Sequence, residues 1–199
     1  MIELSVFPKT FFGVEVPSEI NNRVLDICKR LDYEYDSFPH PLTTNTDLHK
    51  FSDLDFYVKY LNSQIEEIRK RQELNCEKLS ISSMWANKYT ENRMSHRHNH
   101  PMFWLSFIHY LTEGSSTTFY DHHSETPWMW MGESNPTQVS FKPGKNLPVG
   151  SILFFPSWVA HSVEEHIGED RISIAGNIFP EGSINRDGNR EYLNVKLST

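Results

Sequence analysis

The chain has 199 residues, of which 38% are hydrophobic and 13% are aromatic, and its formal net charge at pH 7 is -7. This length fits one domain that can bury its own hydrophobic core, and the negative charge argues against a protein that binds nucleic acid by neutralising phosphates. No secretory signal is visible, and no apolar run approaches the ~18 residues of a membrane span, so we expect a cytoplasmic protein. Cys28 and Cys76 lie far apart in the sequence, and we expect both to be reduced thiols.

The first part of the chain predicts one or two short strands followed by two helices. Residues 2–16 alternate loosely and are rich in aromatic side chains, which favours a strand. A helix is predicted to start at Ser18, which can serve as its N-cap, and residues 32–51 contain prolines and polar clusters typical of a loop. Ser52 is predicted to begin a second, amphipathic helix that lies on a sheet. Its apolar stripe consists of Leu54, Val58, Leu61, Ile65 and Ile68.

After Glu77 the apolar residues recur at every second position, which is typical of strands. Strands are predicted near residues 79–89, 103–112, 116–121, 137–142, 150–155, 161–165 and 171–179, with glycines and prolines at the turns between them. Helices followed by a run of strands predict an α+β protein built on a rolled antiparallel sandwich. We expect residues 1–199 to form a single domain, with support in 1–78, the core in 79–180 and a tail in 181–199.

Several side chains of the predicted core could bind a metal ion. His96, His98 and His100 alternate with other residues, and in an extended segment the three imidazoles would point to one side. His161 follows the string F-F-P-S-W-V-A, and Asp121 ends the apolar strand S-S-T-T-F-Y-D, which a rolled sandwich would bring beside the His161 strand. Two histidines and one carboxylate form the metal site of non-haem Fe(II) oxygenases. The alternatives to metal binding are that His161 is a hydrogen-bonded histidine of the core and that Asp121 is an aspartate in a turn.

A candidate anion site lies in the last predicted strand, R-I-S-I-A-G-N. Strand alternation places Arg171, Ser173 and Asn177 on one face. A guanidinium on the inner face of a small barrel is costly unless it meets an anion, and its planar fork matches a carboxylate. Tyr110 shares the inner face of an earlier strand and is a second candidate donor. The alternative is a structural ion pair with a carboxylate of the chain.

The loop E-T-P-W-M-W-M-G-E, at residues 125–133, carries Trp128 and Trp130. It either packs over the mouth of the barrel or acts as a substrate lid. We assign these two tryptophans and Asn177 to substrate binding. His166 lies in the acidic segment E-E-H-I-G-E-D, and we expect it to be solvated.

Five motifs in order give the chain a family resemblance. They are H-x-H-P, S-x-x-x-Y-L, F-x-D, G-x-x-x-F-F-P-S-W-x-x-H-x-V and R-I-S-I-A-x-N, within residues 79–179. Together they resemble the 2-oxoglutarate/Fe(II)-dependent oxygenases of bacteria and tailed phages, which are related in fold to prolyl hydroxylases. Two departures stand out. Phe107 occupies a position where the family has Gly, and His122 and His123 stand where the family has Pro-Arg.

The resemblance implies a double-stranded β-helix core, of the jelly-roll or cupin-like kind, with two N-terminal supporting helices. It implies Fe(II) held by His98, His161 and a carboxylate, for which Asp121 is the candidate. Related enzymes carry the carboxylate at position 100, so His100 is the alternative third ligand or a group behind the ligands. The resemblance also implies 2-oxoglutarate as co-substrate, with its distal carboxylate on Arg171, and O₂ as oxidant.

The expected activity is hydroxylation of a small molecule or a peptide, such as a peptidyl proline by analogy with the prolyl hydroxylases. Two other classes stay open at this point. One is a cupin-like metal-binding protein without oxygenase activity, such as an isomerase, and the other is a non-catalytic β-sandwich that serves as an interaction module. Binding of a divalent metal and of 2-oxoglutarate separates the three.

Overall fold

The computed structural model describes residues 9–35, 37–121, 138–185, 188 and 190–197. The helices are α1 (Ser18–Cys28) and α2 (Asp55–Arg71), and the short 3₁₀ helices η1 (Leu48–Lys50) and η2 (Ser52–Leu54) precede α2. The first strands are β1 (Phe12–Glu15), β2 (Leu42–Thr43), β3 (Cys76–Tyr89), β4 (Ser95–His98), β5 (Leu105–Tyr110) and β6 (Thr117–Tyr120). They are followed by β7 (Gln138–Phe141), β8 (Ser151–Pro156), β9 (His161–Val163), β10 (Arg171–Ile184) and β11 (Leu193–Val195).

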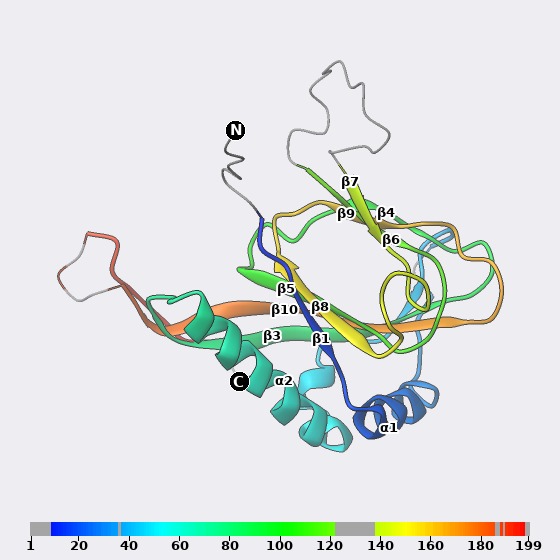
Figure 1. The fold of residues 1–199 in the computed structure, drawn as a ribbon. Helices are drawn as coiled ribbons and strands as arrows, with labels where there is room; N and C mark the ends of the chain where they lie inside the picture. Colours follow the sequence, from blue (N-terminus) through cyan, green and yellow to red (C-terminus); the bar gives the residue numbers. More distant parts are fainter. Residues whose placement is uncertain (1–8, 36, 122–137, 186–187, 189, 198–199) are drawn as a thin grey trace, which may run out of the picture.

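Two antiparallel sheets face each other and enclose the interior of the barrel (Figure 1). The larger sheet has the strand order β1-β8-β5-β10-β3-β2, with β11 paired to β10, and the smaller has the order β4-β9-β6-β7. This is the rolled sandwich that the sequence predicts, and together with the structural likenesses reported below it confirms the double-stranded β-helix in an α+β protein.

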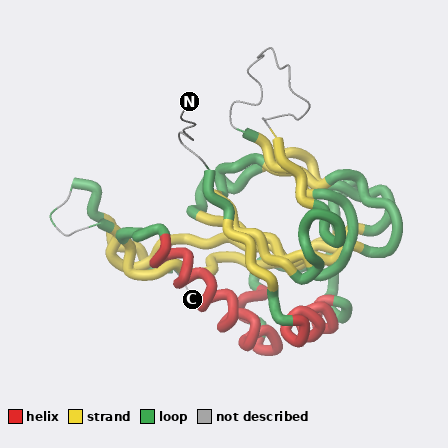
Figure 2. Tube along the Cα trace, viewed as in Figure 1, coloured by secondary structure: helices red, strands yellow, loops and turns green. Residues whose placement is uncertain are grey.

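Both helices cover the outer face of the larger sheet, as Figure 2 shows. Their apolar stripes supply Val24, Leu61 and Ile65 to the hydrophobic core on that side, where each side chain is almost fully buried. Burying these stripes against the sheet stabilises helices that would be marginal alone. Neither helix within the described part of the chain is long and apolar enough to cross a membrane.

The predicted helix starts need correction. Ser18 is the first residue of α1 and not its N-cap, because the Asn21 N–H already bonds to the Pro17 carbonyl at 3.0 Å. The second helix begins at Asp55 and not at Ser52, because residues 52–54 form a tighter 3₁₀ turn.

Alternation along β10 separates two environments. Ile172, Ile174 and Ile178 pack into the core beneath the helices. Arg171 and Ser173 point the other way and line a cavity between the sheets. The face assignments predicted from the R-I-S-I-A-G-N string therefore hold over this stretch.

The predicted strands of the core are all present, but three further strands were not predicted. β2 lies in the predicted loop of residues 32–51, β4 contains the histidine-rich segment, and β11 lies in the predicted tail. β10 also runs past residue 179 to Ile184, because the equally long β3 pairs with it beyond the barrel (Figure 1).

Candidate metal and co-substrate site

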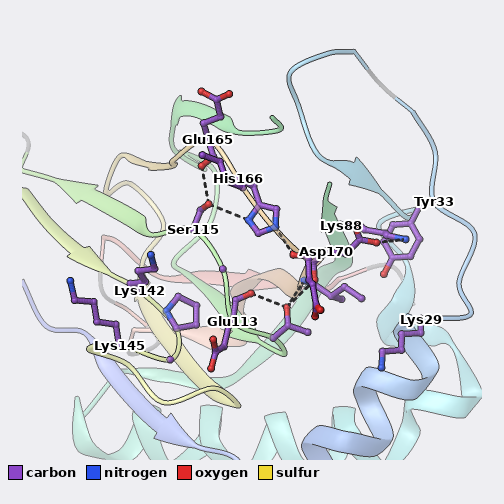
Figure 3. A pocket seen from close by; sticks show the side chains of 17 residues that line it. Lys29, Tyr33, Lys88, Glu113, Ser115, Lys142, Lys145, Glu165, His166 and Asp170 are labelled. Carbon is purple, nitrogen blue, oxygen red and sulfur yellow. Dashed lines mark hydrogen bonds and ion pairs between the residues drawn. The ribbon is translucent and has the colours of Figure 1, made fainter. Parts of the chain in front are cut away.

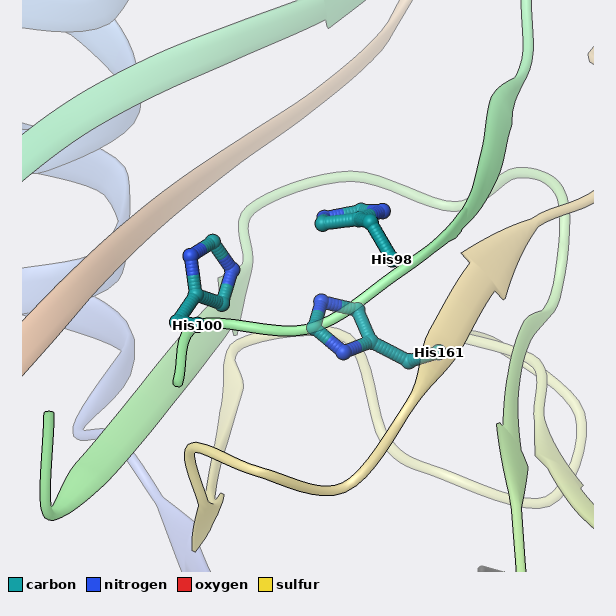
Figure 4. A group of neighbouring side chains, drawn as sticks. All are labelled: His98, His100 and His161. Carbon is teal, nitrogen blue, oxygen red and sulfur yellow. The ribbon is translucent and has the colours of Figure 1, made fainter. Parts of the chain in front are cut away.

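Three imidazoles converge at one end of the barrel interior. His98 ends β4, His100 follows two residues later, and His161 begins β9 (Figure 4). One ring nitrogen from each lies within 4.8 Å of those from the other two. The pairing of β4 with β9 places His98 directly opposite His161, with ring centroids 4.3 Å apart. Three imidazoles at this separation can hold one first-row transition metal ion.

A bulge in β4 decides which histidines converge. Ser95 pairs with Val163 and His98 pairs with His161, so β4 has one more residue than β9 between these pairs. An extra residue interrupts strand alternation. The ring of His96 consequently lies against His40, with centroids 5.2 Å apart, and is absent from the metal group. The prediction that His96 points to the same side is therefore wrong.

Backbone carbonyls orient two of the three rings. His98 Nδ1 lies 2.7 Å from the His96 carbonyl oxygen, and His161 Nδ1 lies 3.1 Å from the Val159 carbonyl oxygen. Because a carbonyl only accepts, each Nδ1 carries the proton and each Nε2 has a lone pair for a metal. Burial lowers the pKa of His161 to about 3 and that of His100 to about 4, and the nearby His98 is the second largest cause for both. Both rings are therefore neutral near pH 7, as ligation requires.

The structure does not bring Asp121 into this group. The strand that it follows does lie beside β9, since Phe119 pairs with His161. The Asp121 carboxylate, however, forms an ion pair with Lys9 at 2.5 Å. Within the described residues, the third donor beside His98 and His161 is His100, the alternative that the sequence left open.

Arg171 is a buried cation that forms no ion pair with the described residues. Its side chain is 1% exposed. Nη1 reaches Ser173 Oγ at 3.4 Å and Nη2 reaches Thr117 Oγ1 at 3.3 Å, both long for hydrogen bonds. Nε has no partner, and no carboxylate of the described residues lies within ion-pair distance. Since a buried charge is costly unless it is paired, this side chain fits an anionic ligand.

Neighbouring residues hold the guanidinium of Arg171 in place. Its central carbon lies 4.7 Å from the Tyr89 ring centroid and 5.6 Å from that of Tyr110. Gly114 packs against the aliphatic stem, where a Cβ atom would stand 2.8 Å from three of the Arg171 carbons. Burial raises the pKa of Tyr110 to about 12, so its hydroxyl keeps the proton, and that hydroxyl has no partner among the described residues. Tyr110 therefore remains a candidate second donor.

The imidazoles and Arg171 line the same cavity. Its described lining contains His98, His100, His161, Arg171 and Ser173, together with Trp85, Asn87, Tyr89, Ser95, Ser106, Phe107, Ile108, Phe155, Val163, Ala175 and Gly176. This part of the lining includes no carboxylate. The cavity therefore combines a metal-binding end with a cationic end, which fits a ligand that chelates a metal and carries a second anionic group.

The sequence reasoning missed three residues of this cavity. Trp85, Asn87 and Tyr89 come from β3, where they alternate on the inner face. The period of two in the predicted strand 79–89 could have identified that face once its pairing with the Arg171 strand was known. Tyr89 and Arg171 are in fact register partners.

The structure describes one of the three predicted substrate-binding residues. Asn177 is 4% exposed, and its side-chain amide bonds to Ser106 and Ser83, while its role in substrate binding stays a prediction. Trp128 and Trp130 lie outside the described residues.

A second cavity of about 960 Å³ lies elsewhere, among Lys29, Lys88, Glu113 and Asp170 (Figure 3). It contains none of the predicted metal or co-substrate residues. His166 lines this cavity and is buried. Its two ring nitrogens have partners: Nδ1 lies 3.2 Å from Ser115 Oγ, and Nε2 lies 2.6 Å from the Glu169 carbonyl oxygen. The prediction that His166 is solvated was wrong. The oppositely charged side chains offset one another, and we assign no ligand to this cavity.

A comparison with known families matches the part of the chain that contains the histidine cluster. Residues 83–177 match the family described as "Putative 2OG-Fe(II) oxygenase". The match confirms the family resemblance seen in the sequence. The matched segment contains all three clustered histidines and Arg171. Among curated protein sequences, none matches the chain.

Solved structures of 2-oxoglutarate oxygenases share the fold. The epimerase SnoN from nogalamycin biosynthesis has a TM-score of 0.65 at 12% identity, over 92% of this chain and 83% of that chain. HygX from Streptomyces hygroscopicus, solved with nickel and 2-oxoglutarate, has a TM-score of 0.63 at 15% identity, over 86% and 83%. A Pseudomonas putida prolyl-4-hydroxylase has a TM-score of 0.65 at 15% identity, over 87% and 94%. At these identities the likeness establishes the fold alone.

Proposed function

We propose that this protein is a 2-oxoglutarate- and Fe(II)-dependent dioxygenase that hydroxylates a C–H bond of a small molecule or a peptide. One observation carries the proposal. Three converging imidazoles and a buried guanidinium, which has no anionic partner among the described residues, line a single cavity. A metal and a dicarboxylic oxo acid would satisfy both at once.

The three histidines would hold the metal through neutral nitrogen donors and leave other coordination positions for exchangeable ligands. With Fe(II) and O₂ bound, 2-oxoglutarate is decarboxylated to succinate, and one oxygen atom is delivered to a substrate C–H bond. The chain's own contribution is to place the reactants. His98 and His161 are fixed by backbone carbonyls, so their metal-binding nitrogens face each other without rearrangement.

Arg171 would bind the distal carboxylate of the co-substrate, with Ser173 and Tyr110 as neutral donors beside it. Ile108 and Phe155 form an apolar part of the cavity wall. An apolar wall keeps water from competing with the bound carboxylate, and the guanidinium is stronger as an anchor in such a medium.

The name of a fold neighbour does not fix the product. SnoN is described as an epimerase and the Pseudomonas putida protein as a prolyl-4-hydroxylase. We propose hydroxylation because it is the simplest fate of the delivered oxygen atom. Mass analysis of the product, with a gain of one oxygen expected, distinguishes it from epimerisation, in which mass is unchanged.

The first experiment needs no substrate. The purified chain is titrated with Fe(II) without oxygen, and 2-oxoglutarate is then added. We expect one Fe(II) per chain, a new visible absorption band on adding 2-oxoglutarate, and slow succinate formation once oxygen enters. His161→Ala is the matched control and is expected to show none of these. Metal binding without any response to 2-oxoglutarate would leave the cupin-like alternative, and failure to bind metal would leave the non-catalytic module.

A further inference from the structure

A row of polar side chains, most of them buried, crosses the larger sheet near the imidazoles. Asn177 on β10 pairs in register with Ser106 on β5 and with Ser83 on β3. The three side chains therefore stand next to each other across neighbouring strands. Ser106 and Asn177 are 2% and 4% exposed.

Hydrogen bonds connect the side chains of this row. Asn177 Nδ2 donates to Ser83 Oγ at 3.1 Å, and Asn177 Oδ1 lies 2.8 Å from Ser106 Oγ. Because Oδ1 only accepts, the single Ser106 hydroxyl proton goes to it. Ser106 Oγ also lies 2.9 Å from Ser157 Oγ, so Ser157 is the next member of the row.

Ser157 connects this row to the metal group. It lies in the turn after β8, fully buried, and its carbonyl oxygen accepts the backbone N–H of His100 at 2.8 Å. The same turn supplies the Val159 carbonyl that accepts from His161 Nδ1. One residue therefore ties the backbone of His100 to the segment that orients His161.

His100 needs such a tie. It lies beyond the end of β4, and unlike His98 and His161 it has no carbonyl bonded to a ring nitrogen among the hydrogen bonds of the described residues. The N–H bond to Ser157 at 2.8 Å is the shorter of its two printed backbone bonds, the other being the Phe103 N–H to the His100 carbonyl at 3.2 Å. A satisfied buried network specifies one geometry, whereas a partly satisfied one is costly and rearranges.

We propose that Ser106, Ser157 and Asn177 are positioning residues for the metal centre, which set the place of His100 relative to His161. This inference rests on the proposed three-histidine metal site. Removing a hydroxyl from the row would leave two buried partners unsatisfied. The Ser157 turn would then shift, and the His100 imidazole with it.

The test measures metal binding and not turnover. Ni(II) affinity is determined by calorimetry for wild type and Ser106→Ala, and the visible spectrum of the Co(II)-loaded protein reports ligand geometry. We expect Ser106→Ala to weaken Ni(II) binding roughly tenfold to a hundredfold, the usual effect of losing a group behind the ligands, and to change the Co(II) bands. Ser157→Ala breaks the same link from the other side and serves if Ser106→Ala does not fold.

Two controls separate positioning from general damage. Ser151 on β8 is also 2% exposed, but its Oγ has no hydrogen-bond partner among the described residues, so Ser151→Ala is expected to bind Ni(II) like wild type. In a His100→Ala background, Ser106→Ala is expected to cause no further loss, because its effect acts through His100. Equal losses in both backgrounds, or unchanged Ni(II) affinity and Co(II) bands in Ser106→Ala, would overturn the positioning role. A wild-type chain that binds no Ni(II) would instead remove the metal site itself, and this inference with it.

Discussion

Replacing Arg171 by methionine is expected to act in opposite directions with and without 2-oxoglutarate. Methionine keeps an unbranched stem that can pack against Gly114, and it removes a buried charge held by two hydrogen bonds of 3.4 and 3.3 Å. In the ligand-free protein the change is expected to be neutral or stabilising, because an unpaired buried cation costs more than its weak contacts return. With the oxo acid bound, the same change removes its anchor.

The size of the second effect follows from the contact that is lost. A hydrogen bond to a charged group contributes about 1.5–3 kcal/mol, so the dissociation constant for 2-oxoglutarate is expected to rise roughly tenfold to a hundredfold. At a ligand concentration one hundred times the wild-type constant, binding stabilises wild type by about 2.7 kcal/mol. A hundredfold weaker variant would gain only ~0.4 kcal/mol at that concentration.

The assay is urea unfolding of the Ni(II)-loaded protein, with and without 2-oxoglutarate, since nickel prevents turnover. Arg171→Lys is expected to recover part of the ligand effect, because it keeps the charge and loses the planar fork. Arg69→Met is the control, since Arg69 pairs with Glu66 on the helix outside the barrel. If 2-oxoglutarate stabilises Arg171→Met as much as wild type, Arg171 is not the anchor.

Three further outcomes are expected. His100→Ala loses Ni(II) affinity by calorimetry while Asp121→Asn retains it, and the reverse order would mean that Asp121 is the third ligand. Gly114→Ala weakens 2-oxoglutarate binding, because its Cβ would push on the Arg171 stem at 2.8 Å and its φ of +148° disfavours any side chain; unchanged affinity would show that the stem can shift at no cost. Burial lowers the pKa of His109 from 6.5 to about 3 in the folded protein. As the pH falls from 6.5 towards 3, the unfolded chain is protonated at this residue while the folded chain is not, so the free energy of unfolding decreases. At pH 5 the loss is about 2 kcal/mol, and urea unfolding of a His109→Gln variant at pH 7.5 and pH 5 is expected to lack this component.

Alternation within one strand was the most reliable guide in the sequence. The string R-I-S-I-A-G-N placed Arg171 and Ser173 inside and Ile172 outside, and the structure agrees because side chains of a paired strand must alternate. The same rule failed at His96. A bulge depends on how β4 pairs with β9, which is a property of two distant segments and cannot be seen in either one.

The partners of the site were harder to predict than its charged residues. Tyr89 was overlooked because only the pairing of β3 with β10 shows that it faces Arg171. Asn177 was assigned to substrate because it shares a face with Arg171, yet a polar side chain on an inner face is also satisfied by its neighbours across the sheet. Choosing between substrate binding and a hydrogen bond to a neighbouring strand requires the pairing register of that strand, which the sequence alone does not specify.

One electrostatic argument connects the proposed ligand role of His100 with the lack of an ion pair at Arg171 among the described residues. Three imidazoles are neutral donors, so a divalent metal would keep its two positive charges, and Arg171 adds a third to a cavity whose described lining holds no carboxylate. Such a cavity disfavours a neutral ligand and favours a dianion that reaches both ends. A carboxylate from the chain near Arg171 would pair with it and remove the reason to bind an anionic co-substrate. We therefore expect the cavity to favour a dicarboxylic oxo acid, provided that Arg171 and the histidine cluster both stay free of carboxylates from the chain.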